Sequence, residues 1–111
     1  MSLVLTAKVV GLTFGAEYPA NIYKIAKRFA MGDDSITLVR EPNNEVDKNA
    51  IAVHDGENPI GHIPRKIAEL LSPQIDAGVK WFAAVDSIIV SQENVNQPGI
   101  KITLWSEAND E

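Results

Sequence analysis

Segment 38–71 constrains the fold of this chain more than any other part of its sequence. Three short apolar runs enter it or lie within it, at residues 36–39, 50–53 and 60–63, and polar turns separate them. Short runs of this kind, bounded by Asn, Asp, Gly and Pro, are typical of strands. Pro64 then begins a pattern with apolar residues at helical spacing. The segment therefore predicts a strand, a polar loop, a strand, a tight turn, a strand and a helix.

The rest of the chain adds three more predicted strands and a second predicted helix. Together the expected strands are 3–12, 35–40, 50–54, 60–63, 80–91 and 100–105, with a bulge near Asp86–Ser87. The expected helices are 19–29 and 64–71, and Ser72–Pro73 should end the second before one more turn at 74–77. Six short strands would expose many unpaired edges unless the sheet closes. We therefore predict a mainly β fold with two short helices, arranged as a small six-stranded β-barrel.

Length and composition exclude several classes of protein. The 111 residues suffice for one domain, which we expect over 1–106, followed by an acidic, disordered tail at 107–111. The chain has no cysteine, so no disulfide or thiolate zinc site is expected. Neither a signal peptide nor an apolar run long enough to span a membrane is recognisable, and we expect a cytoplasmic protein with no membrane partner. The net charge of −5 argues against a non-specific coat for nucleic acid.

The polar loop 43–49 is the first candidate for a binding site. Asn and Asp side chains tolerate unusual backbone conformations and form hydrogen bonds with nearby main chain, so the loop could simply satisfy itself. Alternatively, some of these side chains face a ligand. Asp47 could then accept a hydrogen bond from a hydroxyl, and Asn44 could bind a base edge or a phosphate oxygen.

The second candidate is the segment 61–65, where a strand is expected to give way to a helix. First-turn amides of that helix, together with Arg65 and Lys66, would form an anion site. The alternative is that His62 makes a structural hydrogen bond and both cations are solvated. The spacing of His54, His62, Asp47 and Asp55 matches no metal-ligand pattern, and no nucleophile motif is present. We therefore expect neither an enzyme nor a cofactor.

The sequence resembles a HIRAN domain over nearly its whole length, from about residue 5 to 105. The resemblance rests on the motifs VVGL at 9–12, LVREPNN at 38–44, DKNAIAV at 47–53 and IGHIPR at 60–65. It implies an OB-like β-barrel of the kind found at the N-terminus of SNF2-type helicases that remodel replication forks. In the best-understood members, such a domain captures the 3′ end of single-stranded DNA, with aromatic side chains stacked on bases and an aspartate on the terminal hydroxyl.

The resemblance also implies roles for particular residues. Asp47 stands in the place of the hydroxyl-binding aspartate, and Asn44 matches the polar contact of the loop. The DNA-binding members carry a basic residue where this chain has Thr13 and a stacking tyrosine where it has Val46. The residues implied to bind nucleic acid are Phe14, Asn44, Asp47, Lys48, His62 and Arg65.

Two functions remain open from the sequence. The first is a module that binds single-stranded DNA, preferring a free 3′ end, in DNA repair or replication-fork processing, in company with a helicase or other repair protein. The second is a protein-interaction module that keeps the barrel but has lost the DNA pocket, in keeping with the net negative charge, Thr13 and Val46.

Overall fold

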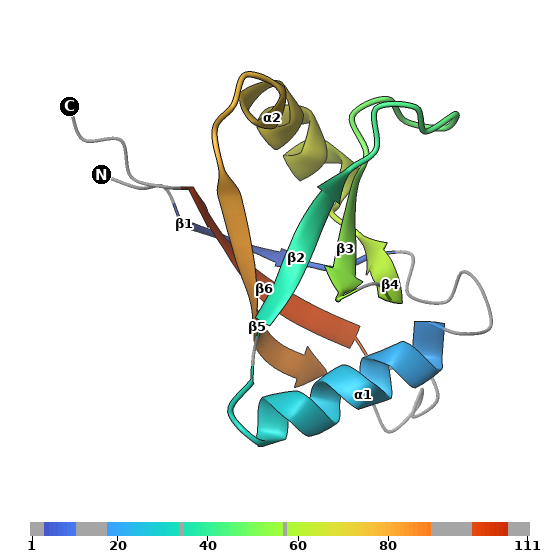
Figure 1. Ribbon diagram of the computed structural model, residues 1–111, viewed down its shortest axis with the longest axis vertical. Helices are drawn as coiled ribbons and strands as arrows, with labels where there is room; N and C mark the ends of the chain where they lie inside the picture. The colour runs from blue at the N-terminus through green and yellow to red at the C-terminus, as the bar shows by residue number, and fades with distance from the viewer. Residues whose placement is uncertain (1–3, 11–17, 34, 57, 90–98, 107–111) are drawn as a thin grey trace.

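The computed structural model describes residues 4–10, 18–33, 35–56, 58–89 and 99–106, with only the backbone described at 18–23 and 58. Its elements follow the predicted order closely (Figure 1). They are β1 (Val4–Lys8), α1 (Tyr18–Ala30), β2 (Ser35–Arg40), β3 (Ile51–Asp55), β4 (Asn58–His62), α2 (Arg65–Asp76), β5 (Trp81–Ile89) and β6 (Gly99–Ser106). The predicted loop at 13–17, the turn residues 96–98 and the acidic tail 107–111 lie outside the described residues.

All six strands pair antiparallel in the order β1-β6-β5-β2-β3-β4. The sheet curves until its two outer strands meet, where Val10 and His62 form an isolated bridge. Each of these residues donates its backbone N–H to the carbonyl of the other at 2.8 Å. The predicted mainly β fold with two helices is therefore confirmed, as a small barrel that one bridge closes.

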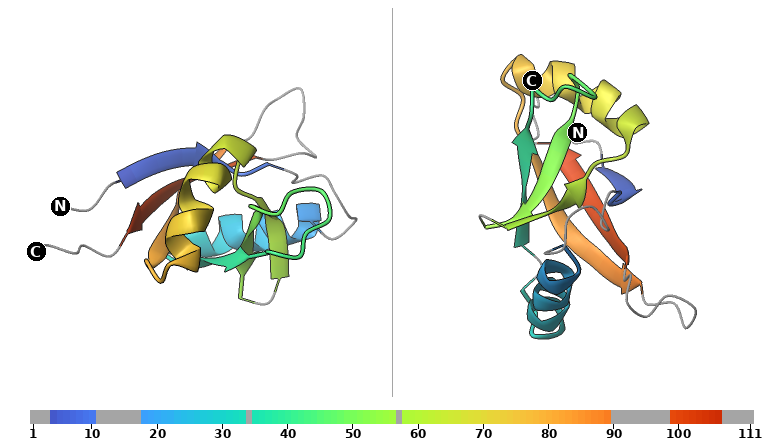
Figure 2. Two further views of the ribbon diagram at one scale, coloured as in Figure 1. Left: turned by 90° about the horizontal axis from the view of Figure 1, so that it is seen from above. Right: turned by 90° about the vertical axis from the view of Figure 1, so that its right-hand side faces the viewer.

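Successive side chains along each strand point to opposite faces, and one set points into the barrel. On β5, Trp81, Ala83 and Val85 are buried whereas Phe82 is exposed. The two helices lie at opposite ends of the barrel (Figure 2). Ile25 of α1 and Leu71 of α2 are both fully buried in the common core. Each side chain of this size contributes roughly 1.5–3 kcal/mol by its burial. Within the described ranges, neither helix is long and apolar enough to cross a membrane.

Two local predictions had different outcomes. The bulge in β5 is confirmed, because the register with β6 shifts between Val85 and Ser87. The helix break at Ser72–Pro73 was wrong, since α2 continues to Asp76 with Pro73 inside it. A proline costs one backbone hydrogen bond in a helix. Here Leu71 and Ser72 are fully buried immediately before it, and that packing keeps the chain helical.

The end of α1 is fixed to the sheet by one arginine. The guanidinium of Arg28 pairs with the buried carboxylate of Asp55 at the end of β3. It also donates to the carbonyl of Ser35 at 3.0 Å, and its Nε lies 3.3 Å from Asp33. Gly32, with φ at 94°, adopts the left-handed conformation that ends the helix. One side chain thus joins α1 to the starts or ends of two strands.

We predict that Arg28→Met destabilises the protein by about 2 kcal/mol, because it leaves the buried Asp55 carboxylate without its counter-charge. The matched control is Lys27→Met, which removes the neighbouring, exposed cation from the same helix. It should change the free energy of unfolding by less than about 0.5 kcal/mol. Urea denaturation of both variants measures the difference, and equal stabilities would contradict the role given to Arg28.

Candidate nucleic-acid interface

The loop between β2 and β3 is shaped by the side chain of Asn44. Its ends are joined where the Glu41 N–H donates to the Ala50 carbonyl at 2.9 Å. The Asn44 Oδ1 accepts from the backbone N–H groups of Val46 and Asp47 at 2.9 and 3.0 Å. Its Nδ2 donates to Glu41 Oε1 at 3.1 Å. Asn44 therefore organises the loop from inside, and these hydrogen bonds occupy both ends of its amide.

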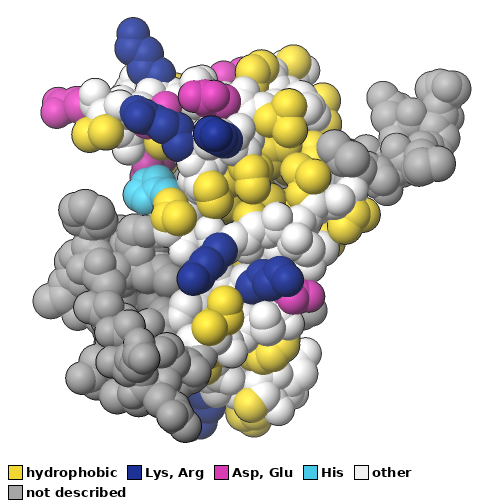
Figure 3. All heavy atoms as spheres, turned by 180° about the vertical axis from the view of Figure 1, so that it is seen from behind, with side chains coloured by type: hydrophobic (Ala, Val, Ile, Leu, Met, Phe, Trp, Pro, Cys, Tyr) yellow, Lys and Arg dark blue, Asp and Glu magenta, His cyan; other side chains and the backbone are white. Residues whose placement is uncertain are grey.

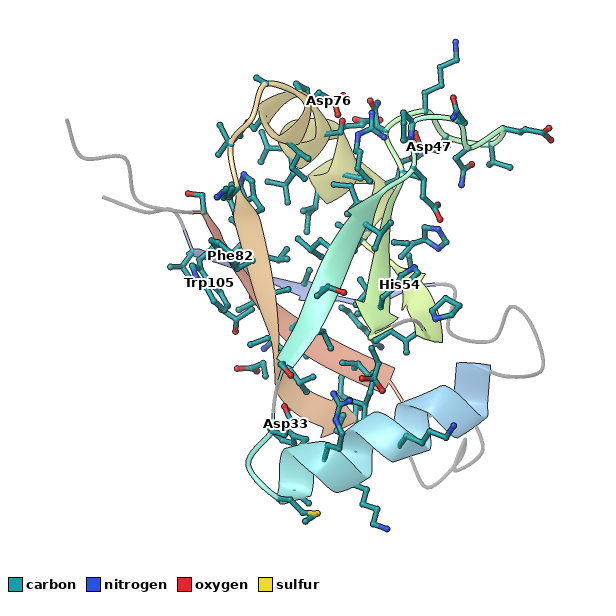
Figure 4. The ribbon with its side chains drawn as sticks, in the orientation of Figure 1. Asp33, Asp47, His54, Asp76, Phe82 and Trp105 are labelled. Atoms are coloured by element: carbon teal, nitrogen blue, oxygen red, sulfur yellow. The ribbon has the colours of Figure 1, made fainter. Side chains whose placement is uncertain are left out.

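Asp47 divides its two carboxylate oxygens between the loop and an arginine. Oδ1 accepts from the Asn49 N–H at 2.9 Å, and Oδ2 lies 3.5 Å from the Arg65 Nε. The Arg65 guanidinium also donates to the Val46 carbonyl at 3.1 Å. The Asp47 side chain is 20% exposed and that of Arg65 is 63% exposed. Oδ2 thus faces a cation at more than ordinary hydrogen-bond length, in a side chain that is partly exposed. Figure 4 shows Asp47 in the loop beyond the ends of β2 and β3.

Glu41 connects this loop to His62, the last residue of β4. Its Oε1 lies 2.8 Å from His62 Nε2 and also accepts from Asn44. Burial by itself would raise the pKa of Glu41. Hydrogen bonds from His62 and Asn44, with the charges of His62 and His54, outweigh that effect and hold the pKa of Glu41 below its usual value. An ionised Glu41 therefore fixes the His62 ring relative to the loop.

The N-terminus of α2 is positive and lacks a side-chain cap. Pro64 occupies the cap position without a side-chain hydrogen bond, and the first turn contains no acidic residue. Arg65 and Lys66 stand there instead, both exposed. Cations at the positive end of a helix dipole are unfavourable, whereas an anion there is stabilised. Figure 3 shows the molecule from behind, where Lys and Arg side chains lie on both sides of a band of hydrophobic ones.

Further side-chain contacts fasten the loop and β2 to α2. The buried Ser72 donates its hydroxyl to Asn49 Oδ1 at 3.0 Å. Arg40, in β2, makes two hydrogen bonds to the carboxylate of Asp76 at 3.0 and 3.1 Å. Sequence reasoning overlooked Glu41, Asn49 and Ser72 as supports of the site. The contacts of Glu41 with His62 and of Asn49 with Ser72 join residues more than 20 positions apart, so no local spacing could have indicated them.

The structure brings together four of the six residues predicted to bind nucleic acid: Asn44, Asp47, His62 and Arg65. Lys48 is exposed on the same loop, and Phe14 lies outside the described residues. Val46 extends from the loop with 84% of its surface exposed. In the part of the chain that the structure describes, no three His, Asp or Glu residues are grouped so as to hold a metal ion.

Comparison with known proteins decides the family. The family model of the HIRAN domain matches residues 5–108. This chain belongs to the HIRAN domain family. It is 35% identical over 107 residues to the helicase-like transcription factor of Mus musculus, a match that covers 95% of the chain. The HIRAN domain described here spans only 10% of that relative's length.

Two solved structures share the architecture. A crystal structure of a protein from Lactobacillus plantarum superposes with a TM-score of 0.73 at 22% identity, covering 96% of this chain and 95% of that one. The crystal structure of the HIRAN domain of human HLTF gives a TM-score of 0.60 at 24% identity, covering 96% of this chain and 80% of that one. At these identities the likeness shows the fold.

We predict that Glu41 contributes to the pH dependence of stability. Its pKa is lower in the folded than in the unfolded protein, where it is about 4.3. The ionised form therefore stabilises the fold above that pH, and the contribution is lost as the pH falls through the folded value. In Glu41→Gln, the free energy of unfolding should fall less steeply with acidification from about pH 5 downward. Urea denaturation across this range measures the two slopes, and parallel curves would contradict the assignment.

Proposed function

We propose that this HIRAN domain is a binding module, not an enzyme, and that it captures single-stranded DNA with preference for a free 3′ end. The observation that carries the proposal is the Asp47–Arg65 pair beside the uncapped N-terminus of α2. The Asp47 carboxylate offers an acceptor for a hydroxyl. Beside it, Arg65 and the backbone amides at the start of α2 offer positive groups for a phosphate. Both ends of a terminal nucleotide would find partners of suitable chemistry.

The loop supports a specific way of binding. Asp47 Oδ1 stays with the Asn49 N–H, which fixes the carboxylate, and Oδ2 accepts the hydrogen of the 3′-hydroxyl. Arg65 lies 3.5 Å away, and its guanidinium is exposed enough to turn toward the adjacent phosphate. Lys48 adds a solvent-exposed cation from the same loop. Asn44 and His62 act by holding the loop and the corner in place, because their observed hydrogen bonds run to Glu41 and the loop amides.

The same arrangement gives a reason for selecting a free end. A 3′-phosphate would bring up to two negative charges against the Asp47 carboxylate and would replace a hydrogen-bond donor with acceptors. A continuing strand would likewise present no hydroxyl hydrogen. The resemblance to DNA-binding members and the similarity to a helicase-like transcription factor support a place in repair or fork processing, alongside a helicase or other repair protein.

We predict that the domain binds a short 5′-labelled oligonucleotide with a free 3′-hydroxyl about tenfold more tightly than its 3′-phosphorylated counterpart, the effect of one charge-assisted hydrogen bond. Asp47→Asn keeps an oxygen for the Asn49 N–H but removes the charge, and should abolish this preference. Glu45→Gln is the matched control, because it removes an exposed carboxylate from the same loop and should keep the preference. Fluorescence anisotropy at low salt measures all three proteins.

Equal affinity of the wild type for the two oligonucleotides would contradict recognition of the end. Thermal unfolding of each variant separates lost binding from lost structure. If Asp47→Asn unfolds the domain, Arg65→Gln provides the second test, because Arg65 is exposed. It should weaken binding to both oligonucleotides by removing the phosphate contact, without changing stability by more than about 0.5 kcal/mol.

We also predict a gain of affinity from a single substitution in the loop. Val46 is 84% exposed, and its side chain has room for a larger group. Val46→Tyr would add an aromatic face for a base, an interaction worth about 1–3 kcal/mol. Affinity for the oligonucleotide with the free end should rise at least fivefold, whereas Val46→Leu should leave it unchanged. Equal affinities of these two variants, measured by anisotropy, would place Val46 away from the bound strand.

The exposure of Val46 also favours the second candidate, a protein-interaction module. An exposed apolar side chain on a loop that is held by internal hydrogen bonds is suited to insertion into a partner protein. This candidate predicts no oligonucleotide binding at low salt and recovery of a specific protein partner that Val46→Asp abolishes.

A further inference from the structure

Two aromatic side chains lie together on the outer face of the barrel. Phe82 of β5 and Trp105 of β6 are paired across the two strands, with ring centroids 6.0 Å apart and ring planes at 31°. Figure 4 shows both side chains on the same side of the sheet. Phe82 is 42% exposed, and Trp105 is half-buried. Val4 of β1 pairs with Trp105 on its other side, so the row crosses three strands.

This row does not belong to the hydrophobic core. The neighbours that point inward, Trp81, Ala83 and Leu104, are the buried ones. The two helices lie over the ends of the barrel, so neither of these described elements covers this outer face (Figure 2). Exposed aromatic side chains that contribute no core packing are more typical of a binding surface than of a structural one.

Cations flank the row in both directions along the strands. On one side, Lys8 and Lys101 stand directly opposite each other in the β1–β6 pairing, and both are exposed. Like charges in this arrangement repel and are relieved by an anion between them. Lys101 is four residues from Trp105, about 13 Å along an extended strand. That separation is within reach of a phosphate one or two nucleotides from a base stacked on Trp105.

On the other side, Phe82 lines a groove together with Lys80 and with Arg40, whose side chain is 15% exposed. Lys80 is exposed. Of the carboxylates in the described ranges, Asp76 is hydrogen-bonded to Arg40 and Asp86 is exposed at the bulge in β5. Among the described residues, the charges around the aromatic pair are thus predominantly positive, although the chain as a whole is negative.

We infer that this outer face binds the interior of a single strand of nucleic acid. Bases stack on Phe82 and Trp105, and phosphates lie near Lys8 and Lys101 on one side and Lys80 on the other. Stacking on aromatic side chains beside cations is the usual way of holding single strands without reading their sequence. This surface needs no free end and lies on different residues from the Asp47–Arg65 pair, so it extends the proposed function to strand interiors.

A small circular single-stranded DNA has no end, so its binding contains no contribution from recognition of a free 3′-hydroxyl. The wild type should bind the circle at low salt with quenching of tryptophan fluorescence, because Trp105 is half-buried whereas Trp81 is only 8% exposed. Phe82→Leu keeps an apolar side chain but removes the aromatic face, and should weaken binding to the circle about tenfold. Lys101→Gln should lower the slope of log affinity against log salt by about one.

The control Leu70→Ala removes an exposed apolar side chain from α2 and should leave binding to the circle unchanged. Asp47→Asn should also leave it unchanged while abolishing the preference for a free 3′ end. If binding to the circle fails and end preference persists, this inference falls and the proposed function stands; the reverse result overturns only the proposed function. Capture of a protein that Phe82→Leu releases, without DNA binding, would also overturn it.

Discussion

The bridge between Val10 and His62 is the contact on which the arrangement of this domain depends. Its two hydrogen bonds of 2.8 Å join the chain just after β1 to the end of β4, the two outer strands of the sheet. Without it, the backbone groups of Val10 and His62 would be unpaired at the two sheet edges. The same residue that closes the barrel with its main chain holds Glu41 with its ring, at 2.8 Å. Closure and the position of the loop are therefore coupled through His62.

The loop illustrates how a polar segment can be both self-satisfied and suited to binding. The hydrogen bonds of the Asn44 amide lie within the loop, as expected if the loop satisfies its own polar groups. Asp47 uses only one oxygen that way and directs the other toward Arg65. The rigid part of the loop lowers the conformational entropy that a ligand would have to remove, since the exposed groups are already positioned. The two interpretations of the sequence thus apply to different side chains of the same loop.

The sequence predicted the strands well because alternation and turn residues act locally. Strand 35–40 was predicted with the bounds that the structure shows, and the bulge in β5 followed from a break in its alternation. Pro73 was misjudged because its effect on the helix depends on the burial of Leu71 and Ser72, which only the tertiary fold sets. Asn44, Asp47, His62 and Arg65 could be proposed as neighbours through family resemblance. The hydrogen-bond partners of these residues could not be predicted, because the folded geometry of the loop decides whether a side chain faces the main chain or a ligand.

The pairing of Val4 with Trp105 has a consequence for how this domain can be built into longer polypeptides. Directly opposed residues of an antiparallel pair have Cα atoms about 5 Å apart, so the chain enters and leaves the barrel at nearly one point. A host protein could accommodate the domain within a surface loop without separating the two flanking ends of its own backbone. The barrel is therefore suited to insertion into a surface loop of another domain, as well as to a position at the start of a larger protein.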